Sequence, residues 1–174
     1  MRPPGLAALF AAIVSASVAV QTPALAVAGT FDVDPSVVVA STCTYNGTGT
    51  LSFGAYDPVV ANASLAATAT GTVSVTCPDT LAYTLTANTG LYGTHASGSC
   101  ATATCTRAML SGSSYLSYDI YTTSAHTTVW NATNSIAGTG SGIAQSISVY
   151  GYIPPAEVAP AGSYADTVTV TVTF

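Results

Sequence analysis

Few side chains in this sequence could carry out catalysis. Hydrolysis needs a base beside a nucleophile, and the two histidines, His95 and His126, lie in stretches rich in Ser, Thr and Gly that indicate loops. Serines are abundant, but the Gly-x-Ser-x-Gly motif of a nucleophile elbow does not occur. Asp32 and Asp34 alternate in the manner of solvated residues on one face of a strand. We therefore expect no enzymatic activity and no catalytic residues.

The composition excludes two classes of partner. Of the 174 residues, 49% are hydrophobic and 5% are charged, and there is no lysine. Binding nucleic acid or an anionic bilayer requires clusters of Lys and Arg, so neither partner is expected. Polarity comes instead from 28 Thr and 19 Ser, which suit strands better than helices. The length is sufficient for one domain with a real core.

The N-terminus has the pattern of a secretory signal peptide. Arg2 precedes an apolar run from Leu6 to Val20, and a small-x-small end follows. We predict a signal peptide over residues 1–26, with cleavage after Ala26 or, as second choice, after Ala28. A membrane anchor is the weaker interpretation, because the run falls short of the roughly 20 residues that span a bilayer. After cleavage, Arg107 is the single basic residue. We expect it to pair with an acid such as Asp119 or Asp166.

Four cysteines remain in the exported chain: Cys43, Cys77, Cys100 and Cys105. An even number in an exported protein predicts a disulfide framework, and four cysteines allow three pairings. Cys100 and Cys105 could close a small loop, and Cys43 and Cys77 would then join two strands. Zinc is the competing interpretation, but neither pair has the spacing of a metal site, so we expect no metal and no cofactor.

Alternation of apolar and polar residues predicts an all-β chain. We expect strands around residues 31–39, 51–53, 73–77, 81–85, 116–120, 147–153 and 164–174, with loops over 88–106 and most of 122–142. About seven short strands separated by turns and stapled by a disulfide favour an immunoglobulin-like sandwich of two sheets, with a barrel as the alternative.

Several motifs, in order along the chain, resemble the spore coat protein U family, which includes major pilins of archaic chaperone-usher pili. The motifs are Phe53-Gly54-Ala55-Tyr56-Asp57, Val73-Ser74-Val75-Thr76-Cys77, Tyr118-Asp119-Ile120-Tyr121, Tyr150-Gly151-Tyr152-Ile153-Pro154, and Ala161-Gly162-Ser163-Tyr164-Ala165-Asp166-Thr167-Val168 with the strand that follows to Phe174. Each motif alone is weak, whereas the ordered set is specific. The resemblance assigns residues 41–174 to one pilin-like domain.

The resemblance implies a structural subunit with an incomplete immunoglobulin-like sandwich that a donor strand completes. Residues 27–40 would be the donor arm, with Phe31, Val33, Val37 and Val39 facing inward. Tyr164, Val168, Val170, Val172 and Phe174 would border the acceptor groove. Pro35 also falls at an inward position and lacks a backbone donor, which leaves the register of the arm open.

The same resemblance implies partners and a location. A periplasmic chaperone would cover the groove, and an outer-membrane usher would exchange the chaperone's strand for the arm of the next subunit. Other copies or related subunits would follow in a fibre used for adhesion and biofilm formation. The chain would reach the cell surface through the periplasm. Two alternatives are a lectin-like module, in which Tyr92, Tyr115, Tyr121 and Trp130 stack on sugars, and a spore-coat protein with a complete sandwich.

Overall fold

The alternating sequence forms β-strands throughout the computed structural model, which describes residues 37, 41–47 and 49–174. Residues 39–174 form one compact unit. Its strands are β1 (Thr44–Tyr45), β2 (Ala67–Thr76), β3 (Ala82–Ala87), β4 (Arg107–Ser111), β5 (Ser114–Tyr121), β6 (Ile136–Thr139), β7 (Ala144–Ile153) and β8 (Val170–Thr173), and η1 (Gly93–His95) is a single 3-10 turn.

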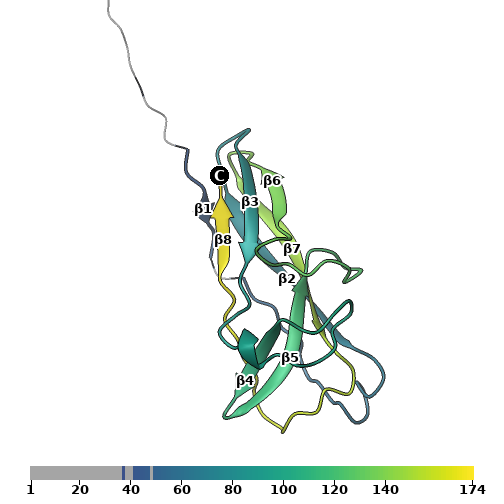
Figure 1. The fold of residues 1–174 in the computed structure, drawn as a ribbon. Coiled ribbons are helices and arrows are strands. Elements are labelled where there is room, and N and C mark those ends of the chain that lie inside the picture. Colours follow the sequence, from purple (N-terminus) through teal and green to yellow (C-terminus); the bar gives the residue numbers. More distant parts are fainter. Residues whose placement is uncertain (1–36, 38–40, 48) are drawn as a thin grey trace, which may run out of the picture. The chain divides into compact units, whose positions relative to one another are not determined.

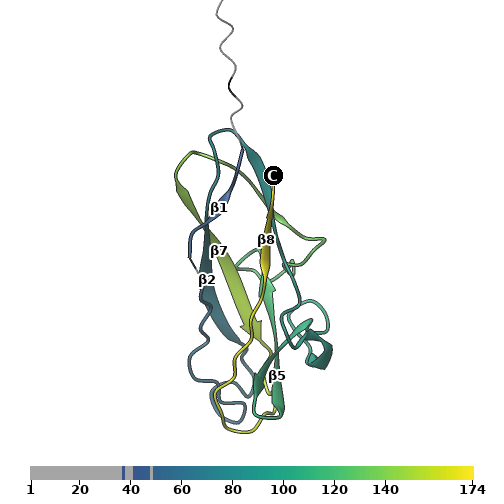
Figure 2. The ribbon, with the colours of Figure 1, turned by 90° about the vertical axis from the view of Figure 1, so that its left-hand side faces the viewer.

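The strands form two antiparallel sheets (Figures 1 and 2). The larger has the order β1-β2-β7-β5-β4, and the smaller has the order β6-β3-β8. The longest ladder joins β2 to β7, from Ala67 opposite Ile153 to Thr76 opposite Ala144. The predicted all-β, immunoglobulin-like sandwich is therefore confirmed. No helix in the described part of the chain has the length and hydropathy needed to cross a membrane.

The core lies between the sheets and follows the period-2 pattern of the sequence. Val73 and Val75 of β2 are buried, whereas Thr72, just before Val73, is exposed. Tyr83 and Leu85 of β3 face them from the smaller sheet, and Trp130 joins the same cluster from the loop that follows β5. Side chains from both sheets thus share one apolar layer, as expected for a sandwich.

Several boundaries differ from the sequence-based prediction. Residues 51–53 form no strand, although they run beside β2, and the regular part of the last strand begins only at Val170. The sequence reading also missed β1, β4 and β6, because each is short and does not show a clean alternation. In β4, for example, Arg107 and Ala108 are both buried in succession.

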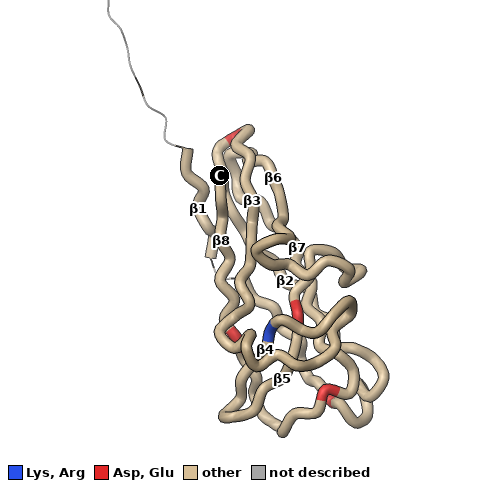
Figure 3. Tube along the Cα trace, in the orientation of Figure 1, with Lys and Arg blue, Asp and Glu red and all other residues tan. Residues whose placement is uncertain are grey.

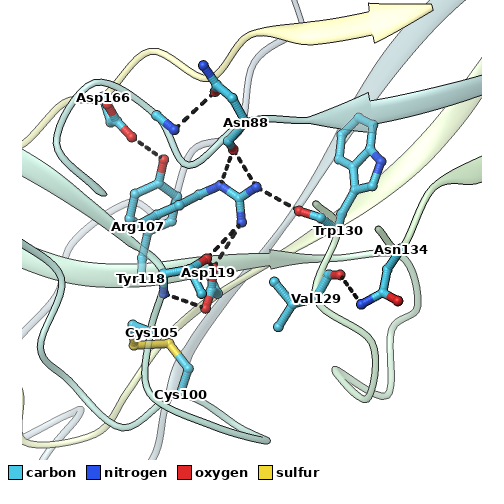
Figure 4. A network of polar contacts seen from close by, with 12 residues as sticks. Asn88, Cys100, Cys105, Arg107, Tyr118, Asp119, Val129, Trp130, Asn134 and Asp166 are labelled. Atoms are coloured by element: carbon cyan, nitrogen blue, oxygen red, sulfur yellow. Dashed lines mark hydrogen bonds and ion pairs between the residues drawn. A yellow bond between two sulfur atoms is a disulfide. The ribbon is translucent and has the colours of Figure 1, made fainter. Parts of the chain in front are cut away.

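A buried polar network ties the two sheets together (Figure 4). Arg107 is the only Lys or Arg in the described residues, and Figure 3 shows how few charges surround it. Its Nη1 donates to Asp119 at 2.9 Å, and both side chains have zero exposure. Its Nη2 donates at 2.6 Å to the backbone carbonyls of Asn88 and Trp130. The Trp130 indole donates in turn to the Leu85 carbonyl of β3 at 2.9 Å.

Two disulfides support this arrangement. Cys43 is bonded to Cys77, which holds the segment before β1 against the end of β2. Cys100 is bonded to Cys105 and closes a small loop just before β4. The second disulfide lies close to the Asp119 carboxylate. Thus a disulfide fixes the segment before β1 and another fixes the loop before β4.

Candidate functional site

A groove of about 560 Å³ runs between the two sheets in the described residues. Residues 164–168 and Val170 form one wall, and Tyr45, residues 49–51 and Phe53 form the other. The floor comes from strands of the larger sheet and from Trp130, and its other lining residues are Thr72, Val73, Met109, Tyr118, Ile120 and Val149. The site is thus a mainly apolar slot between the margins of two sheets.

The first wall has an open backbone edge. Among the described strands, β8 pairs with β3 alone, so its other edge has no partner. Ala165 exchanges backbone hydrogen bonds with Leu110, and Thr169 bonds Asn88 through both its N–H and its carbonyl. Because backbone groups alternate in direction along an extended chain, the groups of residues 166, 168, 170 and 172 point toward the groove side.

The second wall is held close to the larger sheet. Within the described ladders β1 pairs with β2 alone, and the chain continues from it along the same margin. At Gly71 of β2 a Cβ atom would lie 2.6 Å from the carbonyl oxygen of Thr50, so only glycine permits this approach. Residues 49–53 therefore lie over β2 without forming a strand of their own, and their outer edge faces the groove.

One hydrogen-bonded pair of side chains lies among the mainly apolar residues of the slot. The Tyr118 hydroxyl donates to Asp166 Oδ2 at 2.7 Å, and Oδ1 of the same carboxylate accepts from Leu91 N at 2.9 Å and Thr167 N at 2.8 Å. Tyr118 is 4% exposed. Burial, followed by the hydrogen bond to Asp166, raises the pKa of the Tyr118 phenol well above its usual value.

The predicted acceptor residues share one face but do not all line the groove. Tyr164, Val168 and Val170 line it, and Val172 packs against the core just beyond its end. Phe174 is 54% exposed and lies with Tyr83 and Gly138 at a second, shallow depression. Of the predicted donor residues, Val37 is exposed, and Phe31, Val33 and Val39 lie outside the described residues.

The sequence reading missed the polar part of the groove. Asp166 has the same parity as Tyr164 and Val168, and that parity was the available signal. Its partner Tyr118 is 48 residues away in sequence, so the pairing itself could not be read from spacing. The contributions of Met109 and Trp130 to the floor also depend on how the loops fold over the sheet.

The remaining chemistry-bearing residues have structural surroundings. The His95 ring stacks on Tyr115 with centroids 3.9 Å apart, and His126 lies against Tyr121 and Tyr152. The one cluster in the described part of the chain with the composition of a metal site is Cys100, Cys105 and Asp119. Both of its sulfurs are in a disulfide, whereas zinc binds thiolates.

The residues considered for sugar stacking divide into two groups. Trp130 is 1% exposed and Tyr121 is fully buried, so neither ring presents a face to a ligand. Tyr92 and Tyr115 are partly exposed, with ring centroids 6.1 Å apart. Trp130 is therefore a core residue, and the lectin interpretation loses its largest ring.

Comparison with known proteins gives one family and one fold. Protein U of Myxococcus xanthus is 34% identical over 175 residues, covering 96% of this chain and 97% of that protein. A solved structure, titled as the CsuC-CsuE chaperone-tip adhesion subunit pre-assembly complex from archaic chaperone-usher Csu pili of Acinetobacter baumannii, contains a chain with the same fold. That match has 24% identity and a TM-score of 0.53, and covers 78% of this chain and 40% of the other. Residues 27–171 match the model of the Spore Coat Protein U domain. The chain therefore belongs to the Spore Coat Protein U domain family.

Proposed function

We propose that this chain is an exported structural subunit that polymerises by donor-strand complementation into a pilus or surface fibre. Residues 27–40 of one copy would fill the groove of the next. The observation that carries the proposal is the groove, whose apolar floor lies between two strand edges without a partner in the described residues. An added strand could bond to both edges through its backbone and insert alternate side chains into the floor.

Family membership supports a structural role rather than an enzymatic one. An open apolar groove is an aggregation hazard, and strand edges are usually protected by charge, especially by lysine. This chain has no lysine, so another protein must cover the groove before assembly. We assign the covering of the groove to a periplasmic chaperone. An outer-membrane usher would then exchange the chaperone for the arm of the next subunit. The fibre would stand on the cell surface and serve adhesion and biofilm formation.

The arm has the composition of a donor. Phe31, Val33, Val37 and Val39 have one parity and would enter the groove together. Full burial of four such side chains is worth roughly 6 to 12 kcal/mol before ordering costs, at about 1.5 to 3 kcal/mol each. This energy is large enough for a fibre that resists dissociation.

The arm would run antiparallel to β8. Every strand pair in the described residues is antiparallel, and antiparallel pairing is slightly more stable per residue. In that direction the start of the arm lies at the C-terminal end of β8. A second copy of residues 27–40 joined after Phe174 through a turn of two to five residues could therefore fold back as a hairpin strand. We call this the self-complemented chain.

The polymerisation proposal is tested by co-expressing the chain with its cognate chaperone and usher. Unheated gel electrophoresis should give a ladder of multimers that collapses on boiling and disappears when residues 27–40 are deleted. Val33→Asp should abolish the ladder, because it places a charge in the groove, whereas Ser36→Asp, on the outward face of the same arm, should leave it intact. A ladder that survives both the deletion and Val33→Asp would rule out donation by this arm.

The self-complemented chain provides an independent test. It should be a soluble monomer without a chaperone, whereas the mature chain alone should aggregate or self-associate. If the mature chain were instead a stable monomer indifferent to a peptide of residues 27–40, the sandwich would be complete. The coat-protein alternative with a complete sandwich would then be favoured.

A further inference from the structure

Hydrogen bonds hold the carboxylate of Asp166 in one position in the groove wall. It accepts three hydrogen bonds, from the Tyr118 hydroxyl and from the backbone of Leu91 and Thr167. At Gly90, which has a φ of +77°, a Cβ atom would collide with this carboxylate, so glycine is required for the approach. Figure 4 shows Asp166 directed at the phenol of Tyr118. The fold thus places a carboxylate in the wall between Tyr164 and Val168, whose side chains are largely apolar.

The polar position interrupts the wall at one point. The inward residues along the wall are Tyr164, Asp166, Val168 and Val170, which are all half-buried. The inward residues of the arm are interrupted as well, since Pro35 separates Phe31 and Val33 from Val37 and Val39. Large apolar side chains gain most against apolar neighbours, and covering a carboxylate with one of them adds a desolvation cost. The best alignment therefore sets the two interruptions opposite each other.

The backbone is compatible with the same alignment. Proline has no N–H to donate, so it is tolerated in a strand only where the ladder is irregular or at an edge. The regular part of the wall strand starts at Val170. Asp166 lies before that part, in a stretch where Thr167 donates its N–H to the Asp166 carboxylate and Ala165 bonds to Leu110 of β4. A proline opposite Asp166 therefore lies outside the regular ladder of β8.

We propose that the Tyr118–Asp166 pair sets the register of the inserted arm by placing Pro35 of a second copy opposite Asp166. Val33 then lies opposite Val168, Phe31 opposite Val170, and Val37 opposite Tyr164. The alternative register, shifted by two residues, places Val37 on Asp166 and Pro35 opposite Val168. This inference rests on the proposed donor-strand function and specifies which residues of the arm meet which residues of the groove.

Two cysteine pairs distinguish the two registers. Both place one cysteine at residue 168 of the groove and the other at residue 33 or 35 of the arm. Directly opposed residues in an antiparallel pair have Cα atoms about 4.5 to 5.5 Å apart, within the range that a disulfide spans. Fibres of V33C/V168C, assembled with chaperone and usher, should give multimers that survive boiling and collapse only with reductant. The matched variant P35C/V168C should give multimers that collapse on boiling alone.

Cross-linking of P35C/V168C in place of V33C/V168C overturns the register, and so does the absence of cross-linking in both variants when the ladder still requires residues 27–40. A ladder independent of those residues overturns the proposed function itself, and the register with it.

A second set of variants tests whether Asp166 is responsible. In the V33C/V168C and P35C/V168C backgrounds, D166N should keep the preference for the first pair, because the amide preserves the size and an acceptor oxygen. D166L should reduce the ratio of V33C/V168C to P35C/V168C cross-linking at least several-fold, because the wall then has an apolar side chain at residue 166. Equal selectivity in D166N and D166L would show that Asp166 does not set the register.

Discussion

Arg107 Nη1 lies 2.9 Å from Asp119 Oδ1, and both side chains are completely buried in a chain of which only 5% of the residues are charged. The pair does not stand alone. Thr106 donates to Asp119 through its N–H at 2.9 Å and its hydroxyl at 2.6 Å, and the guanidinium bonds two carbonyls. A buried ion pair persists only when its remaining hydrogen-bonding groups are satisfied, and here they link β3, β4, β5 and the Trp130 loop.

We expect removal of one partner to be strongly destabilising. Arg107→Met leaves Asp119 buried without its counter-charge and two carbonyls without a donor, at a cost of about 3 to 5 kcal/mol in the free energy of unfolding. Arg107→Met combined with Asp119→Asn should recover a substantial part of the loss, because no uncompensated charge remains. Urea unfolding of the self-complemented chain measures both. Equal stability of the single and double variants would show that charge burial is not the source of the loss.

The two disulfides should contribute unequally. Cys43 and Cys77 are 34 residues apart and Cys100 and Cys105 are 5 apart. On the chain-entropy model, closing the longer loop is worth about 3.8 kcal/mol and the shorter about 2 kcal/mol. C43S/C77S should therefore lower the thermal midpoint of the self-complemented chain more than C100S/C105S does. The reverse order would mean that the small loop stabilises chiefly through its contacts near Asp119.

The sequence predicted the elements whose pattern is local. The alternation of Val73, Val75 and Cys77 identified β2, and the parity of Tyr164, Val168 and Val170 identified the groove wall, because a period of two fixes which face is buried. It could not predict that Asp119 rather than Asp166 pairs with Arg107, since both acids were possible and the choice depends on how β5 packs on β4. The Tyr118–Asp166 bond was missed for the same reason.

Trp130 should behave as a core residue in any assay. Trp130→Ala removes the largest buried side chain and its hydrogen bond to Leu85, with an expected cost of about 3 to 5 kcal/mol. Trp130→Phe should cost less, since most of the volume remains. Tyr92→Ala, at a partly exposed ring, is the matched control and should leave unfolding nearly unchanged. Loss of glycan binding by a Trp130 variant with unaltered stability would contradict this assignment.

Tyr118 should make the fold sensitive to alkali. Its pKa in the folded chain is raised above the ordinary value of 10.0, first by burial and then by Asp166. The stabilisation is fully present below pH 10, where both the folded and the unfolded chain keep the proton. Above pH 10 the unfolded chain releases it while the folded chain holds it, so stability falls as the pH rises toward the folded pKa.

A Tyr118→Phe variant isolates this effect. It lacks the hydroxyl, so a constant loss is expected below pH 10 from the missing bond to Asp166. Above pH 10 the advantage of the parent chain should shrink by about 1.4 kcal/mol per pH unit, which corresponds to one proton. Denaturant unfolding of the two self-complemented chains between pH 8 and pH 11 gives the comparison. Parallel stability curves across that range would mean that Tyr118 titrates alike in the folded and unfolded chains, and that the groove floor admits water at this position.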